Sequence, residues 1–325
     1  MEETNFTPRT DLSDLKNSIE RVRAEIKKII VGQGKIIDMM IAAVLADGHV
    51  LIEGVPGIAK TLLAKLVART ISADFSRIQF TPDLMPSDIL GTSVFNMKTT
   101  EFEFNRGPIF SNIILIDEIN RAPAKTQSAL FEAMEERQVT IDGTTHKLES
   151  PFTVFATQNP IEHEGTYKLP EAQLDRFLFK VEMDYPLPDE EVKILLDLHS
   201  RKNINDLSII QPVFTKEALK QLREKVRKIH LEEKVAGYIA KIVNNTRNNS
   251  DLYLGGSPRA SISIMIGAKA LAAIGGRDFV TPDDVREVVH PALRHRILLT
   301  PEKEMEGRTP DDIIKTVLER VEVPR

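Results

Sequence analysis

The feature that most constrains the fold is the segment at residues 54–61, which reads Gly-Val-Pro-Gly-Ile-Ala-Lys-Thr. An apolar run at residues 49–52 precedes it, and a segment with helical periodicity begins at Leu62. A glycine-rich turn between a strand and a helix offers backbone N–H groups and a partial positive charge to an anion. A simple Gly-Pro turn is the alternative, and it is disfavoured because strand and helix both flank the motif. The segment therefore predicts a polyphosphate-binding loop.

The last residues of this loop have separate predicted roles. Lys60 is expected to reach the β- and γ-phosphates, and the Thr61 hydroxyl to bind Mg²⁺. Ala59 stands where a glycine is usual, and we expect it to have a negative φ, as a residue already entering the helix would. The residues predicted to bind the nucleotide here are Gly54, Val55, Pro56, Gly57, Ile58, Ala59, Lys60, Thr61 and Leu62.

Polar side chains follow two further apolar runs. Asp117 and Glu118 end the run at residues 113–116, and Asn159 follows the run at 152–156. Asp117 is predicted to hold Mg²⁺, directly or through water, and Glu118 to polarise the attacking water. In a parallel sheet Asn159 would lie beside Asp117, at the edge where ligands bind. A solvated turn for the acids and an Asn-Pro turn are the alternatives, and the position after a phosphate loop favours the catalytic interpretation.

Two arginines lie where a cation requires a partner. Arg176 is placed between apolar residues, so either a γ-phosphate of a neighbouring subunit or an internal acid is expected to neutralise it. Arg259 lies in the first turn of a helix that begins at Ser257 and Pro258, where the helix dipole disfavours a positive charge. Bound nucleotide is its predicted partner, and simple solvent exposure is the alternative.

The order of apolar segments predicts two domains. Strands and helices alternate up to residue 187, and short, largely apolar strands are typical of a parallel sheet covered on both faces. Beyond Pro186 and Pro188 every segment has helical periodicity. We therefore expect an α/β phosphate-loop nucleotide-binding domain at residues 11–187 and an all-α domain at residues 188–325.

Two β-hairpins are predicted to interrupt the first domain. Residues 100–105 alternate polar and apolar side chains, and residues 139–148 contain an Asp-Gly turn between two arms. Phe102 and Phe104 on the first hairpin could grip a partner or form a small local core, and the sequence does not choose between these.

Composition excludes several classes of protein. The chain has 325 residues, no cysteine and a formal net charge of −5, so disulfides and thiolate chemistry are excluded and nucleic acid is not favoured as a partner. The chain has no apolar run near the roughly 20 residues of a membrane helix, so no membrane span is expected. The acidic start at residues 1–4 does not resemble a signal peptide. We expect a cytoplasmic protein.

With these residues placed, the chain resembles the AAA+ ATPases, and among them the MoxR family, over about residues 12–320. The resemblance rests on the phosphate loop and on four further motifs, at residues 31–33, 117–122, 156–160 and 169–177. It implies an AAA+ type α/β core followed by an all-α lid, with Walker A at residues 54–61. The other site residues that it implies are Asp117 and Glu118 as Walker B, Asn159 as sensor 1, Arg176 as arginine finger, Arg259 as sensor 2, and Val31, Gly32 and Gln33 as adenine contacts.

What the resemblance implies about activity is specific. MoxR-like proteins use ATP and Mg²⁺, assemble as homo-oligomers that are typically hexameric rings, and act as chaperone-like ATPases on protein clients. They commonly work with von Willebrand factor A-domain proteins in complex maturation or in cofactor and metal insertion. Each of these properties is an expectation for this chain.

Three other functions compete with a protein remodeller. A nucleic-acid motor is disfavoured because the hairpin at residues 139–148 offers only His146 and Lys147 as cations. The ATPase subunit of a chelatase-like complex is a related enzyme that stays open. A nucleotide-gated scaffold that barely hydrolyses ATP is disfavoured because Glu118 and Asn159 are both present.

Overall fold

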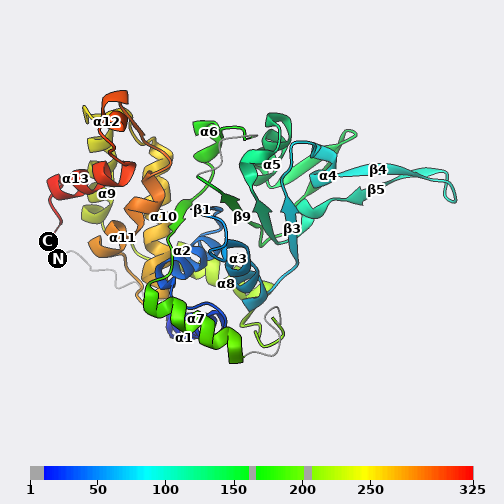
Figure 1. Cartoon of the computed structure of the whole chain (residues 1–325), viewed down its shortest axis with the longest axis horizontal. Helices are drawn as coiled ribbons and strands as arrows, with labels where there is room; N and C mark the ends of the chain where they lie inside the picture. Colours follow the sequence, from blue (N-terminus) through cyan, green and yellow to red (C-terminus); the bar gives the residue numbers. More distant parts are fainter. Residues whose placement is uncertain (1–10, 161–165, 201–206, 325) are drawn as a thin grey trace, which may run out of the picture.

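Five parallel strands form the central sheet of the computed structural model, which describes residues 11–160, 166–200 and 207–324 (Figure 1). The strand order is β10-β1-β9-β6-β3, and each neighbouring pair is parallel. The strands are β1 (Val50–Gly54), β3 (Phe75–Gln79), β6 (Ile113–Asp117), β9 (Thr153–Gln158) and β10 (Phe179–Met183). All five therefore end at one edge of the sheet, the carboxyl edge where ligands bind in such folds.

The apolar strands are buried because helices cover both faces of the sheet. On β6, Ile113 and Leu115 belong to one apolar cluster, whereas Ile114 and Ile116 belong to the other. Alternate side chains of a strand point to opposite faces, so a continuous apolar run fits this arrangement. The first cluster includes residues of α1 (Ser13–Lys27), α2 (Gly34–Leu45) and α3 (Lys60–Thr70), and the second includes residues of α5 (Ala124–Glu136).

Beyond residue 188 the chain is mainly helical. α10 packs on α2, so the apolar cluster on that face of the sheet continues into this region. The predicted fold class, an α/β core followed by a helical lid, is confirmed. The helices are α7 (Pro188–Ser200), α8 (Lys216–Arg227), α9 (Glu233–Arg247), α10 (Pro258–Ile274), α11 (Pro282–Leu293), α12 (Pro301–Met305) and α13 (Pro310–Arg320).

Short strands add to the helical pattern predicted beyond residue 188. β12 (Leu252–Leu254) pairs antiparallel with β13 (Leu298–Leu299), and β11 (Phe214–Thr215) pairs parallel with β2 (Ile71–Ser72). These segments are too short for an alternating side-chain period to show in the sequence, which is why the sequence pattern predicts only helices there.

Helix starts follow local sequence signals. The Thr281 hydroxyl caps α11 and the Thr309 hydroxyl caps α13, and in each case it accepts a hydrogen bond from a backbone N–H in the first turn. The remaining short helices are α4 (Pro86–Leu90), η1 (Pro108–Phe110), η2 (Ile119–Arg121) and α6 (Glu171–Leu174).

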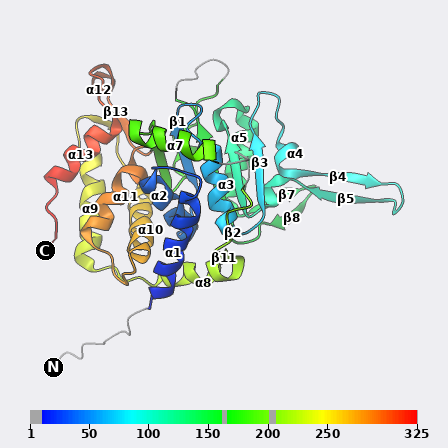
Figure 2. The same cartoon turned by 60° about the horizontal axis from the view of Figure 1, so that its bottom comes forward.

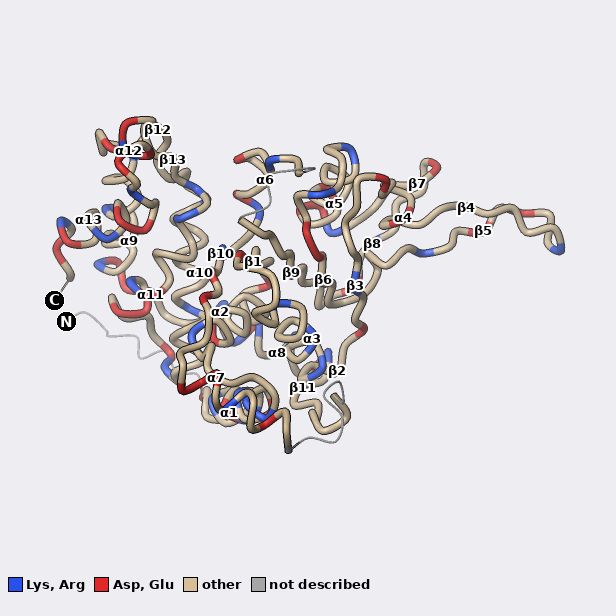
Figure 3. Tube along the Cα trace, in the orientation of Figure 1, with Lys and Arg blue, Asp and Glu red and all other residues tan. Residues whose placement is uncertain are grey.

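A hairpin is present at each predicted place, but residues 100–105 form only the second arm of the first hairpin, whose first arm lies at residues 91–96. β4 (Gly91–Asn96) and β5 (Glu101–Arg106) extend away from the body of the molecule (Figures 1 and 2). β7 (Gln138–Ile141) and β8 (Thr144–Lys147) lie beside their base (Figure 2). Charged residues of both signs occur along the longer hairpin (Figure 3).

The two phenylalanines of the longer hairpin have different environments. Phe104 stacks on His146 of the second hairpin, with ring centroids 4.3 Å apart, and also contacts Phe110. Phe102 is 73% exposed and packs edge-on against Phe95, at a centroid distance of 5.3 Å. Phe104 thus belongs to a local core, whereas Phe102 presents apolar surface to solvent.

The sequence predicts that no helix spans a membrane. In the part of the chain that the structure describes, no helix is both long and apolar enough to cross a bilayer. The acidic start at residues 1–4 lies outside the described residues.

Candidate nucleotide-binding site

The predicted phosphate loop connects the carboxyl end of β1 to the first residue of α3. Lys60 begins α3, and its ammonium group donates hydrogen bonds to the carbonyl oxygens of Gly54 and, at 3.3 Å, of Gln158. The lysine therefore lies over the ends of two adjacent strands, β1 and β9. The backbone N–H groups in the first turn of α3 lack helical acceptors and point toward the loop, as an anion site requires.

The backbone conformation of Ala59 differs from the one expected from the sequence. Its φ is +67°, in the left-handed region, whereas a residue already entering the helix would have a negative φ. Ala59 is instead the residue before the helix, and the turn from β1 into α3 imposes this conformation on it. A left-handed alanine costs roughly 1–2 kcal/mol, so the loop holds backbone strain next to the predicted phosphate contacts.

The two predicted acids lie at the same edge as the loop. The Thr61 hydroxyl donates a 3.1 Å hydrogen bond to Oδ1 of Asp117, so the two predicted Mg²⁺ ligands are adjacent. A hydroxyl and a carboxylate are hard oxygen ligands of the kind that Mg²⁺ prefers, so these residues fit that ion. Glu118 is next in the chain, and its backbone has a φ of +58°, a left-handed conformation that is uncommon outside glycine.

Four residues to which the sequence assigns no individual role contact these acids. Nε of Arg77 lies 2.6 Å from Oδ2 of Asp117, and the amide of Gln79 donates a 2.7 Å hydrogen bond to Oε2 of Glu118. Both belong to β3, the strand beside β6, and a polar residue at the end of a strand was the available signal for Gln79. The other two are Thr157, which donates to Asp117 and accepts from the backbone N–H of Glu118, and Arg121, which lies 3.1 Å from the Glu118 carboxylate.

The remaining residues predicted near this edge are Asn159 and the segment at residues 31–33. Asn159 is buried and follows the last residue of β9, the strand beside β6.

The segment at residues 31–33 contacts the chain that leaves β10. The side-chain amide of Gln33 donates a 3.1 Å hydrogen bond to the carbonyl oxygen of Asp184. Gly32 has a φ of +70°, and a Cβ there would meet the carboxylate of Glu190 on α7, so the position favours glycine.

Arg176 and Arg259 lie at the opposite, amino edge of the sheet. The backbone N–H of Leu178 bonds the carbonyl oxygen of His49, which places the chain just after Arg176 beside the start of β1. A strand of this length spans about 16 Å, so the two arginines are separated from the phosphate loop of their own chain by about the length of the sheet. The structure therefore brings Lys60, Thr61, Asp117 and Glu118 together but does not bring the two arginines to them.

The two arginines share one acidic partner. Nη1 of Arg176 lies 2.5 Å from Glu135, and Nη2 of Arg259 lies 2.8 Å from the other oxygen of the same carboxylate. Within a single chain, the internal acid that the sequence allowed as a partner of Arg176 is thus Glu135. A cavity of about 250 Å³ opens beside them, and Arg137 and Arg296 also line it. This edge of the molecule therefore presents several guanidinium groups in a hollow, a surface suited to an anion.

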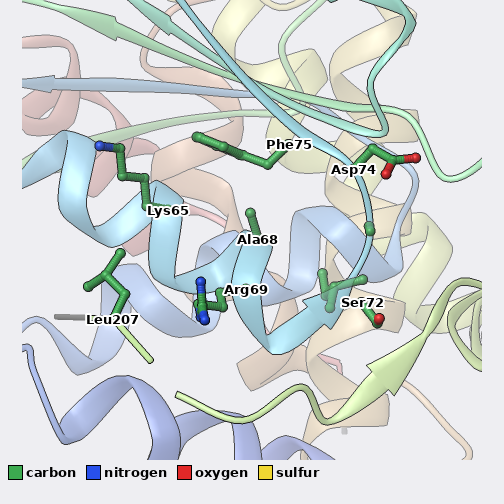
Figure 4. Close-up of a pocket in the computed structure, with 9 residues that line it drawn as sticks. Lys65, Ala68, Arg69, Ser72, Asp74, Phe75 and Leu207 are labelled. Carbon is green, nitrogen blue, oxygen red and sulfur yellow. The ribbon is translucent and has the colours of Figure 1, made fainter. Parts of the chain in front are cut away.

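A larger cavity lies away from both groups. It measures about 490 Å³ and is lined by Lys65, Arg69, Asp74 and Phe75, at the end of α3 and the start of β3 (Figure 4). Because it lies at the amino end of β3, it is distinct from the phosphate loop at the carboxyl edge.

With this geometry in place, comparison with known proteins identifies the family. Residues 49–179 match the ATPase family associated with various cellular activities (AAA), and residues 244–317 match the AAA lid domain. The chain is 45% identical over 318 residues to the chaperone MoxR1 of Mycobacterium tuberculosis, and the match covers 95% of this chain and 83% of that protein. The chain belongs to the MoxR family of AAA+ ATPases. It is an ATPase, and ATP hydrolysis is its reaction.

Two further similarities extend over almost the whole chain. The YeaC protein of Bacillus subtilis (strain 168) is 46% identical over 311 residues, which cover 96% of each chain. A crystal structure of a candidate ATPase from Cytophaga hutchinsonii has a TM-score of 0.88 and 43% identity, and the match covers 96% of this chain and 97% of the other. The similarity therefore includes the helical region of this MoxR-family protein as well as its nucleotide-binding core.

Proposed function

We propose that this MoxR-family ATPase binds MgATP at the loop of residues 54–61 and hydrolyses it at an interface between subunits. Lys60 and the first turn of α3 would hold the phosphates, while Thr61 and Asp117 would hold Mg²⁺, which offsets phosphate charge when bound. Glu118 would take the proton from the attacking water, and Asn159 would orient that water. The adjacency of the Thr61 hydroxyl, the Asp117 carboxylate and the Lys60 ammonium supports this assignment.

The observation that carries the subunit interface is the position of Arg176 and Arg259. They lie at the amino edge of the sheet, whereas the phosphate loop of the same chain lies at the carboxyl edge. Two guanidinium groups that lie far from their own nucleotide site fit the γ-phosphate of a neighbour. We therefore propose a homo-oligomer, a closed ring of six, in which each chain completes the site of the next.

Mixing two inactive variants tests this arrangement. Arg176→Ala should bind ATP normally but hydrolyse it roughly 10³-fold or more slowly, as loss of an arginine finger does elsewhere. Glu118→Gln should bind ATP and fail in hydrolysis. An interface with Glu118 from one chain and Arg176 from the next is intact, so mixed rings should regain activity that neither variant has.

Two controls make the mixing experiment decisive. Lys60→Ala should lose ATP binding itself, which separates binding from catalysis. Native mass spectrometry should show both chains in one particle. Mixed particles with no regained activity would exclude a site shared between subunits in this form.

We propose that hydrolysis drives remodelling of client proteins, with a von Willebrand factor A-domain protein as partner, and that one outcome is complex maturation or insertion of a cofactor or metal. Support comes from the similarity to a chaperone and from the β4–β5 hairpin, whose exposed Phe95 and Phe102 provide apolar surface for unfolded segments. Purification from native extract in the Glu118→Gln background, which should hold ATP, tests this. A bound von Willebrand factor A-domain protein is expected, and recovery of a nucleic acid instead would contradict it.

Three further assignments belong to the same proposal. We place the domain boundary between residues 187 and 188, and the protein in the cytoplasm. Nucleic acid is proposed to be a poor partner, because His146 on the β7–β8 hairpin stacks on Phe104 and the net charge of the chain is −5. Binding to DNA below micromolar concentration with a steep salt dependence would overturn the last assignment.

A further inference from the structure

Glu135 lies between the two arginines of the amino edge. Its Oε2 is 2.5 Å from Nη1 of Arg176, and its Oε1 is 2.8 Å from Nη2 of Arg259. The three residues come from different parts of the fold, because Glu135 is near the end of α5, Arg176 precedes β10 and Arg259 lies in the first turn of α10. One carboxylate therefore joins the α/β core to the helical lid at this point.

Each arginine has a second contact besides Glu135. Nη1 of Arg176 also donates to the carbonyl oxygen of Phe131 at 2.6 Å, one turn earlier on α5. Nη1 of Arg259 lies 3.8 Å from Asp175, whose other oxygen is held at 2.5 Å by the buried Arg296. Arg259 therefore lies between two carboxylates, whereas Arg176 lies between a carboxylate and a backbone carbonyl oxygen.

Two guanidinium groups this close repel each other, and the partial burial of Arg176 reduces the screening of that repulsion by water. A carboxylate between them removes part of the repulsion and lets both side chains point to one place. The hydrogen bond from Arg259, followed by further contributions from both arginines, lowers the pKa of Glu135 below its usual range, so the carboxylate is ionised at neutral pH. Each arginine contacts a different oxygen of this carboxylate, so the two guanidinium groups are held side by side by one side chain.

We infer that Glu135 is a positioning residue, which aligns Arg176 and Arg259 so that both reach the γ-phosphate held by the neighbouring chain. This inference rests on the proposed function, in which those arginines act on a neighbour. Glu135 itself does not touch the nucleotide in this arrangement. Its contribution is to the geometry of the arginines, and an error of about 1 Å in such geometry can cost about 10²-fold in rate.

The direct test compares three variants in steady-state ATPase assays. Glu135→Ala should lower kcat by about 10- to 100-fold while KM for ATP changes by less than about twofold, because the residues proposed to hold ATP are unchanged and the aligned arginines act on the transferred phosphate in the transition state. Glu135→Gln keeps one hydrogen-bond acceptor and should fall between Glu135→Ala and the parent protein. Glu136→Ala, on the next and exposed residue of α5, removes the same charge and should retain parent activity.

Complementation separates positioning from general damage to the fold. Glu135→Ala mixed with Glu118→Gln should regain activity, because the arginines of the second variant are correctly aligned. Glu135→Ala mixed with Arg176→Ala should gain nothing beyond the mean of the two, because both are defective at the same edge. A merely structural defect would not follow this pattern.

The results of these mixtures distinguish the role of Glu135 from the shared site itself. If Arg176→Ala and Glu118→Gln complement each other but Glu135→Ala and Glu118→Gln do not, the inference about Glu135 is wrong and the shared site stands. Parent-like kcat in Glu135→Ala, or a large rise in its KM for ATP, also overturns the inference. If neither mixture regains activity, the shared site and the role of Glu135 are both wrong.

Discussion

The side-chain amide of Gln79 donates a 2.7 Å hydrogen bond to Oε2 of Glu118, the proposed general base. Gln79 is the last residue of β3, and β3 pairs with β6 so that Gln79 lies opposite Asp117. The register of the sheet therefore sets this contact, and it links the orientation of the base to a neighbouring strand.

Gln79→Ala is expected to lower kcat about tenfold with little change in ATP binding, because Glu118 loses one of the groups that orient it. The decisive measurement is a double variant. In the Glu118→Gln background, Gln79→Ala should cause no further loss, since Gln79 acts through Glu118. A further loss of similar size in the double variant would show that Gln79 has a role of its own.

Arg77 and Mg²⁺ are expected to compete for Asp117. Nε of Arg77 lies 2.6 Å from Oδ2, and the side chain is 47% exposed, so the ion pair contributes only about 1 kcal/mol. Arg77→Gln should lower the Mg²⁺ concentration for half-maximal ATPase activity by about three- to fivefold. Arg69→Gln, at an exposed position of α3, is the matched control. A higher Mg²⁺ requirement in Arg77→Gln would mean that Arg77 assists the ion.

The backbone strain at Ala59 predicts a stabilising substitution. Because φ is +67° there, Ala59→Gly should raise the free energy of unfolding by about 1 kcal/mol in the absence of nucleotide. Ala64→Gly, inside the following helix, should lower it by about 1 kcal/mol or more. Urea denaturation followed by circular dichroism measures the change in the free energy of unfolding for both variants. Changes of the same sign would contradict the left-handed conformation of Ala59.

The hairpin phenylalanines should differ in their effect on stability. Phe104→Ala removes the stack on His146 and should lower the free energy of unfolding by about 1–2 kcal/mol. Phe102→Ala removes a ring that is 73% exposed and should change the free energy of unfolding by less than about 0.5 kcal/mol. Loss of ATPase stimulation by clients in Phe102→Ala alone would connect the exposed ring with client contact.

Two buried histidines should make stability fall in mild acid. Burial lowers the pKa of His49 and of His295 well below the usual range, so the folded protein binds fewer protons than the unfolded chain below pH ~6.5. Their contribution to stability is therefore fully present above about pH 6.5 and declines as pH falls, by up to about 1.4 kcal/mol per pH unit for each histidine.

Besides its burial, one hydrogen bond of His49 requires an unprotonated ring nitrogen. Its Nδ1 accepts a 2.9 Å hydrogen bond from the backbone N–H of Val154, and its Nε2 lies 3.3 Å from the carbonyl oxygen of Met134. One proton, on Nε2, satisfies both contacts. Urea unfolding between about pH 5 and pH 8 measures the slope, and NMR titration of the two imidazoles provides the check. Protonation of either ring near its ordinary pKa in the folded protein would contradict the expected slope.

Features that depend on neighbouring residues could be predicted without knowledge of the fold. The predicted phosphate loop is a strand, a turn and a helix start in direct succession, so the roles proposed for Lys60 and Thr61 follow from the chain alone. Helix caps at Thr281 and Thr309 and the turn of the β7–β8 hairpin are equally local. Apolar runs also predicted a parallel sheet, because strands covered on both faces need no polar side.

Which distant residues meet depends on how the strands and the helical lid pack together. β3 lies beside β6, and this order brings Arg77 and Gln79 to the two acids. Glu135 and Arg259 are 124 residues apart in the sequence, and packing of the helical lid on the core brings them together. The φ of Ala59 also depends on the folded structure, because closing the turn between β1 and α3 sets this angle. Residue type and spacing encode local geometry. Strand order and lid packing instead depend on how the whole chain minimises its exposed apolar surface, and no short segment contains that information.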